Sequence, residues 1–428
     1  MNKKIFGCLG VAAVFLALQF TSAKVQAGIF SPCTPCDEVG YCDADNCDPC
    51  DAVCGTKAGK WFINGHIEAG FYANAHGATS TYTGVYGGIG SSYSGGLRDR
   101  GAFVMSGNTA FLQNTRLTNA QINQVYLSVG KSVDGRRGLD IGGTVDFTWG
   151  SDAYAVQASG MEITAKDPTG WGSGDYSAAF AQAYAEVAYK KWNVKAGKFY
   201  APFGSTCYKT TDNFFYSWAT TWMIAPSTST GVYATYQVND KLSVIGGWVT
   251  PEEFAHCTDN NFGLGGLAWN PNKRLSVLYT FAAGKECGAF TGMPAGTQVS
   301  VHSLVATTQV TKRVKYVFDW TLFNANYSGY VTASTYGLNN ELIFQANKRW
   351  AFGTRFGMLH GNAYGYAYTT TDADLYTIAL GANWTPNKWL TVKSEVRYDW
   401  IDPSIYAFFD NETSEHQFSG GMSAVVKF

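Results

Sequence analysis

Apolar and polar residues alternate along most of the chain after Trp61. A typical run covers residues 390–400, where apolar and charged side chains follow one another, as in Val396, Arg397, Tyr398 and Asp399. Successive side chains of a β-strand point to opposite faces, so this period of two predicts strands with one apolar and one polar face. Similar runs, among them 139–149 and 417–428, bring the total to sixteen candidate strands of about 8 to 13 residues.

The links between these runs alternate between short and long. The short links centre on residues 135, 190, 240, 271–274, 312–313, 347–349 and 386–388. The long links cover 73–120, 150–178, 201–229, 251–261, 284–299, 324–333, 360–373 and 401–415. Bacterial outer-membrane barrels combine an even strand number with short periplasmic turns and long external loops. The pattern therefore predicts an all-β fold, a single antiparallel up-and-down transmembrane β-barrel of about sixteen strands over residues 60–428.

Backbone hydrogen bonding is the physical basis of this assignment. An unpaired N–H or C=O group in hydrocarbon costs several kcal/mol, so only a sheet closed on itself can cross a bilayer. The outer face must then be apolar, and the inner face is expected to be polar. Aromatic residues near the strand ends fit the two interfacial girdles of such barrels, namely Trp149, Trp192, Trp350, Trp389, Trp400 and Phe428. A soluble propeller or sandwich would leave the charged faces and the alternating links unexplained.

Composition narrows the possible functions. Of the 428 residues, 46% are hydrophobic and only 15% are charged, against about 25% in soluble domains. Lys+Arg number 31 and Asp+Glu 32, so the formal net charge is -1 and no basic surface for nucleic acid is indicated. The 6 histidines are scattered without metal-ligand spacing, and no Gly-x-Ser-x-Gly motif occurs. We therefore expect no nucleic-acid partner, no cofactor and no enzymatic activity.

Two segments precede the predicted barrel. Lys3 and Lys4, an apolar run over 5–20 and the sequence Val-Gln-Ala before Gly28 predict a secretory signal peptide over residues 1–27. Residues 28–59 form a cysteine-rich segment that we expect in the periplasm, with Cys33, Cys36, Cys42, Cys47, Cys50 and Cys54. An exported compartment permits disulfides, and three bridges are the first interpretation. A metal site at the two Cys-x-x-Cys pairs is the alternative.

Three further cysteines, Cys207, Cys257 and Cys287, fall in long links. They make nine cysteines after removal of the signal peptide, so one thiol is expected to be unpaired or intermolecular. A bridge between Cys257 and Cys287, which would stiffen the mouth of the barrel, is a hypothesis that mass spectrometry of unreduced peptides can test.

Six short segments share their order and spacing with a known family. They read NQVYLS at 123–128, DFTWGSDA at 146–153, QAYAEV at 182–187, KAGKFYAPFG at 195–204, NFFYS at 213–217 and TGVY at 230–233. In this arrangement the chain from about Asn119 onward resembles the OmpL-like β-barrel porin family of porin-2 type. The resemblance implies an outer-membrane pore. It does not cover the cysteine segment 33–54 or the link 73–118.

Barrel size indicates where the function lies. Side chains fill an eight-stranded barrel, whereas sixteen strands leave an aqueous channel. We therefore predict an outer-membrane porin for passive diffusion of small hydrophilic solutes, with weak ion selectivity because the wall charges nearly balance. The pore-lining candidates are Asp140, Asp146, Glu186, Lys195, Lys315, Asp319, Glu341, Arg355, Lys393, Glu395 and Arg397. For each of them the alternative is a wall charge paired with a neighbour.

The resemblance adds a constriction and several partners. The third external loop of porin-like barrels folds inward, which points to residues 201–229. Its candidates are Lys209, Asp212, Asn213, Tyr216 and Trp218, which could line a narrow eyelet or form an aromatic cap over the rim. Phe428 resembles the terminal signal read by the barrel assembly machinery, and a trimer is expected by analogy. The alternative function is a non-catalytic surface or envelope-linking barrel with recognition loops.

Overall fold

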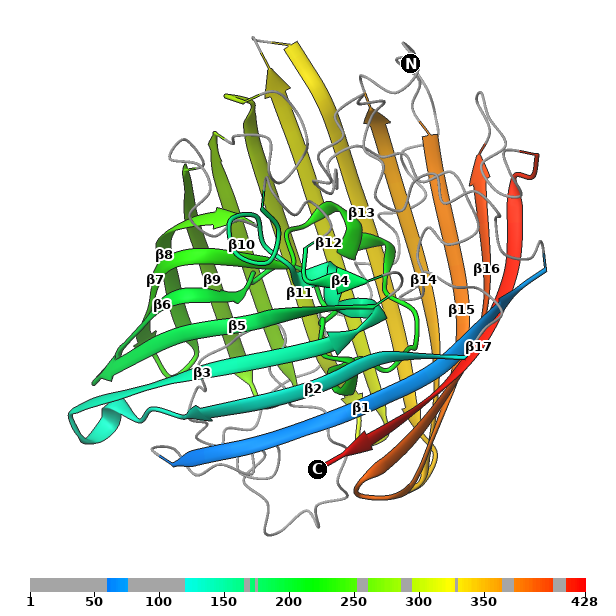
Figure 1. The fold of residues 1–428 in the computed structure, drawn as a ribbon, viewed down its shortest axis with the longest axis horizontal. Helices are drawn as coiled ribbons and strands as arrows, with labels where there is room; N and C mark the ends of the chain where they lie inside the picture. The colour runs from blue at the N-terminus through cyan, green and yellow to red at the C-terminus, as the bar shows by residue number, and fades with distance from the viewer. Residues whose placement is uncertain are drawn as a thin grey trace.

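The computed structural model describes residues 60–75, 120–164, 170–173, 176–251, 261–285, 295–327, 330–363, 373–402 and 413–428. Sixteen long strands form one antiparallel sheet in which each strand pairs with the next (Figure 1). The last strand, β17 (His416–Lys427), pairs back to the first, β1 (Trp61–Asn74), over nine residue pairs. This pairing closes the sheet into a barrel and confirms the predicted fold class.

The other strands follow in chain order around the barrel. They are β2 (Gln121–Lys131), β3 (Leu139–Gly150), β5 (Tyr176–Tyr189), β6 (Trp192–Tyr200), β7 (Thr228–Asn239), β8 (Leu242–Pro251), β9 (Asn261–Asn272), β10 (Leu275–Lys285), β11 (Gln298–Thr311), β12 (Val314–Tyr327), β13 (Tyr330–Gln345), β14 (Trp350–Ala363), β15 (Ala373–Asn387) and β16 (Leu390–Asp402). A two-residue strand, β4 (Gly172–Ser173), pairs only with the start of β5.

Helical structure in the described residues is confined to short 3₁₀ turns. These are η2 (Gly135–Arg137), η3 (Ser151–Val156), η4 (Thr210–Asp212) and η5 (Thr220–Ile224). None of the helices in this part of the chain is long and apolar enough to cross a membrane.

The short turns share one hydrogen-bonding device. The side-chain oxygen of Asn272 accepts hydrogen bonds from the backbone N–H groups of Arg274 at 2.8 Å and Leu275 at 3.1 Å. Asn347 and Asn387 hold the turns that follow β13 and β15 in the same way. Asparagine side chains favour tight turns because they bond their own backbone two residues on. The repeated Asn-Lys step therefore ends one strand and starts the next.

One predicted long link is wrong. The expected loop 324–333 is mostly strand, because β12 continues to Tyr327 and β13 begins at Tyr330. The polar residues that resemble a loop are paired across the ladder, and the Ser334 hydroxyl donates to the Asn324 side-chain oxygen at 2.8 Å. Backbone pairing can continue beyond the apolar part of a strand, so polarity alone did not mark its end.

The outer face of the barrel is apolar. Large side chains such as Ile141, Leu267, Phe352 and Leu380 are 59%, 48%, 46% and 57% exposed at strand positions that alternate with buried ones. Aromatic rings gather at both strand ends, where Trp192 packs on Tyr236 at 4.6 Å between ring centroids and others pair likewise. Apolar side chains in contact with lipid tails are not exposed to water, so their position on the outer face is typical of a membrane-spanning barrel.

The inner face is not uniformly polar, which corrects the sequence-based expectation. Strands β12 to β17 and β1 to β3 turn mostly polar and charged side chains inward. Strands β8 to β11 instead bury apolar side chains on the inside, namely Ile245, Val249, Phe262, Leu264, Leu278, Val299 and Val301. Apolar groups facing water would be unfavourable, so this half of the barrel needs an apolar partner inside.

Candidate functional site

The link between β6 and β7, residues 201–227, supplies that partner and is called here the interior loop. Its turns η4 and η5 lie between the near and far walls of the barrel (Figure 1). Phe203, Ile224 and Ala225 join the apolar cluster formed by the inner faces of β8 to β11. Full burial of one such aromatic or branched side chain contributes about 1.5–3 kcal/mol. The loop is therefore part of the core, whereas the alternative of an aromatic cap over the rim would place it at the mouth of the barrel.

Strand sequences on this side carried a signal for the inward loop. Residues 242–249 and 299–306 contain apolar side chains at adjacent positions, so both faces of these strands are apolar. A strand with two apolar faces is expected only where both faces are covered. Lipid covers the outer face, and the interior loop covers the inner one.

Ser217 is the point where the interior loop is held most tightly to the opposite wall. Its backbone N–H and its hydroxyl donate to the two carboxylate oxygens of Glu395, at 2.9 and 2.5 Å. Its carbonyl oxygen accepts from Arg355 Nη1 at 2.8 Å, and its hydroxyl accepts from Arg397 Nη1 at 3.1 Å. Every polar group of Ser217 thus meets a charged residue of β14 or β16.

Two neighbouring ion pairs fix the arginines that reach Ser217. Arg355 donates from Nε to Glu341 at 2.9 Å and lies 4.2 Å from the centroid of the Phe215 ring. Arg397 donates from Nε to Asp399 at 2.7 Å, and both side chains of this pair are fully buried. Hydrogen bonds to a charged group contribute about 1.5–3 kcal/mol each, so these pairs position the guanidinium groups firmly.

Other wall charges hold the loop at separate places. Asp319 on β12 accepts from the backbone N–H of Ser205 at 2.8 Å and from the Thr221 hydroxyl at 2.9 Å. Lys393 on β16 donates to the carbonyl oxygens of Thr210 at 2.7 Å and Asn213 at 2.8 Å. The loop leaves the wall at β6 and contacts β12 and β16, which lie at least six strands away around the barrel, so it crosses the interior.

A second segment, residues 151–164, packs beside the interior loop. The ammonium group of Lys198 lies 3.1 Å from both carboxylate oxygens of Glu162, and both side chains are fully buried. Asp152 accepts from the Gln124 side chain at 3.0 Å. Burial, together with the nearby Glu68 carboxylate, raises the pKa of Asp152 well above its ordinary value.

The predicted pore-lining residues separate into two groups. Seven are buried inside the barrel, and most of these contact a loop or a paired charge: Asp146, Asp319, Glu341, Arg355, Lys393, Glu395 and Arg397. Four are partly exposed: Asp140, Glu186, Lys195 and Lys315. Asp140 pairs with Lys131 at the short-turn end, and Glu186 accepts from the Asn193 side chain at 2.7 Å.

The five constriction candidates all lie in the interior loop. Tyr216 is buried against Tyr72 and donates to the Asn123 side chain at 3.0 Å. Lys209, Asp212, Asn213 and Trp218 are partly exposed, and the Lys209 ammonium lies 5.8 Å from the centroid of the Tyr126 ring. Sequence reasoning missed Ser217 as a site residue, although it ends the segment NFFYS at 213–217, because its small side chain carries no charge.

The cysteine predictions lie almost entirely outside the described residues. This holds for Cys33, Cys36, Cys42, Cys47, Cys50, Cys54, Cys257 and Cys287, as it does for the expected signal peptide. Cys207 is buried in the interior loop, where Asn213 bonds its backbone N–H and carbonyl groups. Among the described residues, no group of three or more His, Cys, Asp or Glu side chains is placed to hold a metal ion.

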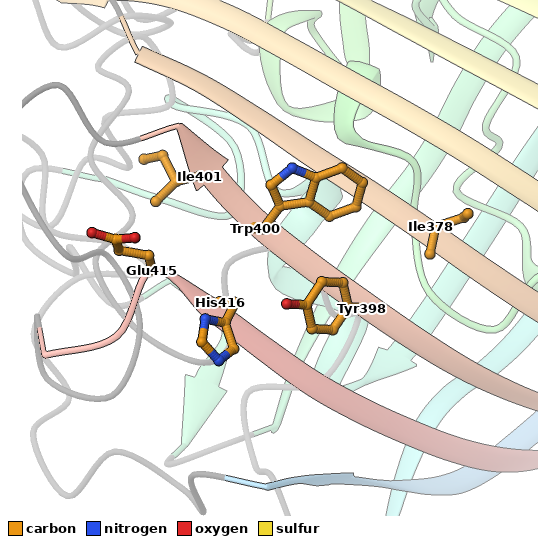
Figure 2. A pocket seen from close by; sticks show the side chains of 6 residues that line it. All are labelled: Ile378, Tyr398, Trp400, Ile401, Glu415 and His416. Carbon is orange, nitrogen blue, oxygen red and sulfur yellow. The ribbon is translucent and has the colours of Figure 1, made fainter.

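The outer face carries a separate groove of about 550 Å³ near the long-loop ends of β15, β16 and β17. Figure 2 shows Trp400, Tyr398 and Ile378 along it, with Glu415 and His416 at one end. The groove faces away from the interior loop and belongs to the aromatic girdle of the lipid-facing surface.

A closed barrel of sixteen strands with a long loop folded inside defines the class of porin-like outer-membrane barrels. The family described as "Putative beta-barrel porin-2, OmpL-like" matches residues 63–428, and the chain belongs to that family. This confirms the predicted resemblance and places the protein in the outer membrane. The sequence matches no curated protein.

Solved outer-membrane barrels share the fold at low sequence identity. The channel DcaP of Acinetobacter baumannii is 10% identical with a TM-score of 0.54, over 86% of this chain and 97% of that one. OmpT of Vibrio cholerae, in trimer form, is 12% identical with a TM-score of 0.53, over 87% and 100%. An anion-selective porin from Comamonas acidovorans is 10% identical with a TM-score of 0.52, over 86% and 99%.

Proposed function

We propose that this protein is a passive diffusion channel for small hydrophilic solutes, narrowed by the interior loop. The observation that carries the proposal is the anchoring of Ser217 by Glu395, Arg355 and Arg397 across the barrel. A loop held by buried charges keeps one shape, so it limits solute size instead of opening and closing freely. No catalytic role is proposed for any of these residues.

Partly exposed charges mark the proposed water path. Lys209 and Asp212 on the loop, with Glu186, Lys195 and Lys315 on the wall, are only partly covered in the described part of the chain. Charges that retain water contact act on passing ions, whereas buried pairs mainly hold structure. The path is therefore bordered by both signs of charge, which favours weak ion selectivity.

Single-channel recording of the folded protein in a planar bilayer tests the proposal. We expect stepwise conductance, and liposome swelling that declines with increasing sugar size. Folding is checked by heat-modifiable gel migration. Folded protein that conducts no ions and admits no sugar would refute the channel.

Lys209 provides a sharper test of the path. Lys209→Glu is expected to shift the reversal potential in a salt gradient toward cation preference, because it places a negative charge beside the path. The matched control is Lys285→Glu, which changes the same charge at the exposed end of β10. Equal shifts in the two variants would mean that Lys209 does not border the path.

A closed structural barrel is the second candidate function. It is favoured by the contacts that the interior loop makes with β2, β12, β14 and β16, which lie on different sides of the interior. In that case the long loops would carry surface recognition or the cysteine segment would bind another envelope component. The conductance measurement separates this candidate from the first.

Export and assembly complete the proposal. We infer a signal peptide over 1–27, a periplasmic segment over 28–59 with three disulfides, and a homotrimer. Phe428 exchanges backbone hydrogen bonds of 2.9 Å with Gly65 and is 65% exposed, which leaves it accessible to the assembly machinery. Deleting Phe428 is expected to lower the amount of folded protein in the outer membrane, which fractionation measures.

A further inference from the structure

The short-turn end of the barrel is strongly basic. Each of the seven turns at this end carries at least one exposed basic side chain, and together they form what is called here the short-turn rim. Its members are Arg136, Arg137, Lys190, Lys191, Lys241, Lys273, Arg274, Lys312, Arg313, Lys348, Arg349 and Lys388. The same turns contain two acidic residues, Asp134 and Asp240. Asp134 already accepts from Arg136 Nε at 2.8 Å.

The long links have the reverse composition. Links 75–120, 151–175, 201–227, 252–260, 286–297, 364–372 and 403–415 together contain fourteen Asp or Glu and five Lys or Arg residues. The basic residues are therefore concentrated in the short turns, at one end of the barrel.

The turn geometry fixes the backbone positions of several rim residues. The asparagine-based turns bond the backbone N–H of Lys241, Arg274 and Arg349 at 2.8 to 2.9 Å, so these residues occupy the same turn position in three hairpins. The cations are spread around the circumference and do not converge on one pocket. A continuous anionic surface fits this arrangement better than a single small anion.

Aromatic girdle residues lie directly beside the rim on the lipid-facing side. Trp192, Trp269 and Trp389 are 51%, 47% and 50% exposed at the short-turn ends of their strands. The Lys190 ammonium lies 5.1 Å from the centroid of the exposed Tyr189 ring, so this cation lies at the girdle. Tryptophan and tyrosine rings occupy the headgroup level of a bilayer, which places the rim next to lipid phosphates.

We propose that the short-turn rim binds the headgroups of anionic phospholipids in the adjacent leaflet. Each cation close to an anionic membrane surface strengthens binding about fivefold. The competing occupant is the acidic part of segment 28–59, which enters the barrel at the same end through Trp61 and contains Asp37, Glu38, Asp43, Asp45, Asp48 and Asp51. The aromatic girdle beside the rim favours lipid as the occupant, because the exposed rings pack against lipid and would have no such contact with an acidic peptide in water.

Electron spin resonance with spin-labelled lipids tests the proposal on the full chain. The protein is folded into phosphatidylcholine vesicles, and the immobilised fraction of labelled phosphatidylglycerol is compared with that of labelled phosphatidylcholine. The rim variant replaces four cations of two turns by glutamine: Lys190→Gln, Lys191→Gln, Lys312→Gln and Arg313→Gln. The matched control removes the same charge from the long links: Arg98→Gln, Arg100→Gln, Arg116→Gln and Lys166→Gln.

We expect the wild type and the matched control to prefer phosphatidylglycerol severalfold, and the rim variant to lose most of that preference. A wild type without preference, or equal losses in both variants, would overturn the proposal. So would a preference that emerges only when the six acidic residues of segment 28–59 are neutralised, because that segment would then occupy the rim. The assay does not measure conductance, so its failure is distinguishable from failure of the channel.

Discussion

Glu395→Gln is the substitution that most directly tests how the interior loop is held. Glu395 accepts two hydrogen bonds from Ser217 and one from the Tyr72 hydroxyl at 3.2 Å. Glutamine keeps the shape but loses the charge and one acceptor oxygen. Hydrogen bonds to a charged group contribute about 1.5–3 kcal/mol against about 1 kcal/mol for neutral ones, so the expected loss of unfolding free energy is about 2–4 kcal/mol.

A double-mutant cycle with Ser217→Ala isolates the contact between the loop and the wall. Equilibrium urea unfolding in lipid vesicles, followed by tryptophan fluorescence, gives the free energy of unfolding of each variant. Residues in direct contact show coupling of about 0.5–3 kcal/mol, and we expect a value of at least about 1 kcal/mol here. The single variants should also increase channel current noise, because the loop gains freedom.

The control exchanges acid for amide where the carboxylate is partly exposed. Asp140→Asn removes the partner of Lys131 at the short-turn end, where water screens the pair, so the loss should be much smaller than for Glu395→Gln. The anchoring of the loop would be refuted if the effects of Glu395→Gln and Ser217→Ala were additive. It would also be refuted if Glu395→Gln and Asp140→Asn lowered the free energy of unfolding equally.

Two further predictions use the membrane and pH. Leu380→Arg places a charge on the outer face near the middle of β15 and should lower the free energy of unfolding by about 2–4 kcal/mol. Val310→Arg places the same charge near the end of β11, close to the membrane surface, and should lower it by about 1 kcal/mol or less. Equal losses would contradict the assignment of these side chains to the lipid-facing surface. The pKa of Asp152 is raised in the folded state, so ionisation of this carboxyl group destabilises the fold as pH rises above 3.8, the ordinary pKa of aspartate. Asp152→Asn should therefore become more stable relative to wild type between pH 4 and 8, which urea unfolding at a series of pH values measures. Hydrogen bonds from Arg136 lower the pKa of Asp134, so the contribution of this carboxylate to folding stability is present above pH 3.8 and lost as pH falls. Asp134→Asn should therefore be less stable than wild type at neutral pH. Stability changes of the same sign in Asp152→Asn and Asp134→Asn would contradict the opposite pKa shifts of the two groups.

Much of the wall could be predicted from the chain itself. The two-residue period set which side chains face lipid, since a strand alternates its faces regardless of what lies inside the barrel. Asn272, Asn347 and Asn387 end their strands through local hydrogen bonds, so the short turns are also local properties of the sequence. Strand ends in polar sequence were less certain, as the extension of β12 to Tyr327 shows.

What the charged wall residues contact was decided by tertiary structure alone. Alternation placed Arg355, Glu395 and Arg397 on the inner face. Their common partner, Ser217, is 138, 178 and 180 residues away from them in the chain. No local pattern encodes a contact over such a separation, because it depends on the closure of the barrel and the path of residues 201–227. Alternation and link lengths indicate a closed barrel of about sixteen strands, because both are local features of the chain. The path of the interior loop then sets which wall charges hold structure and which remain near water.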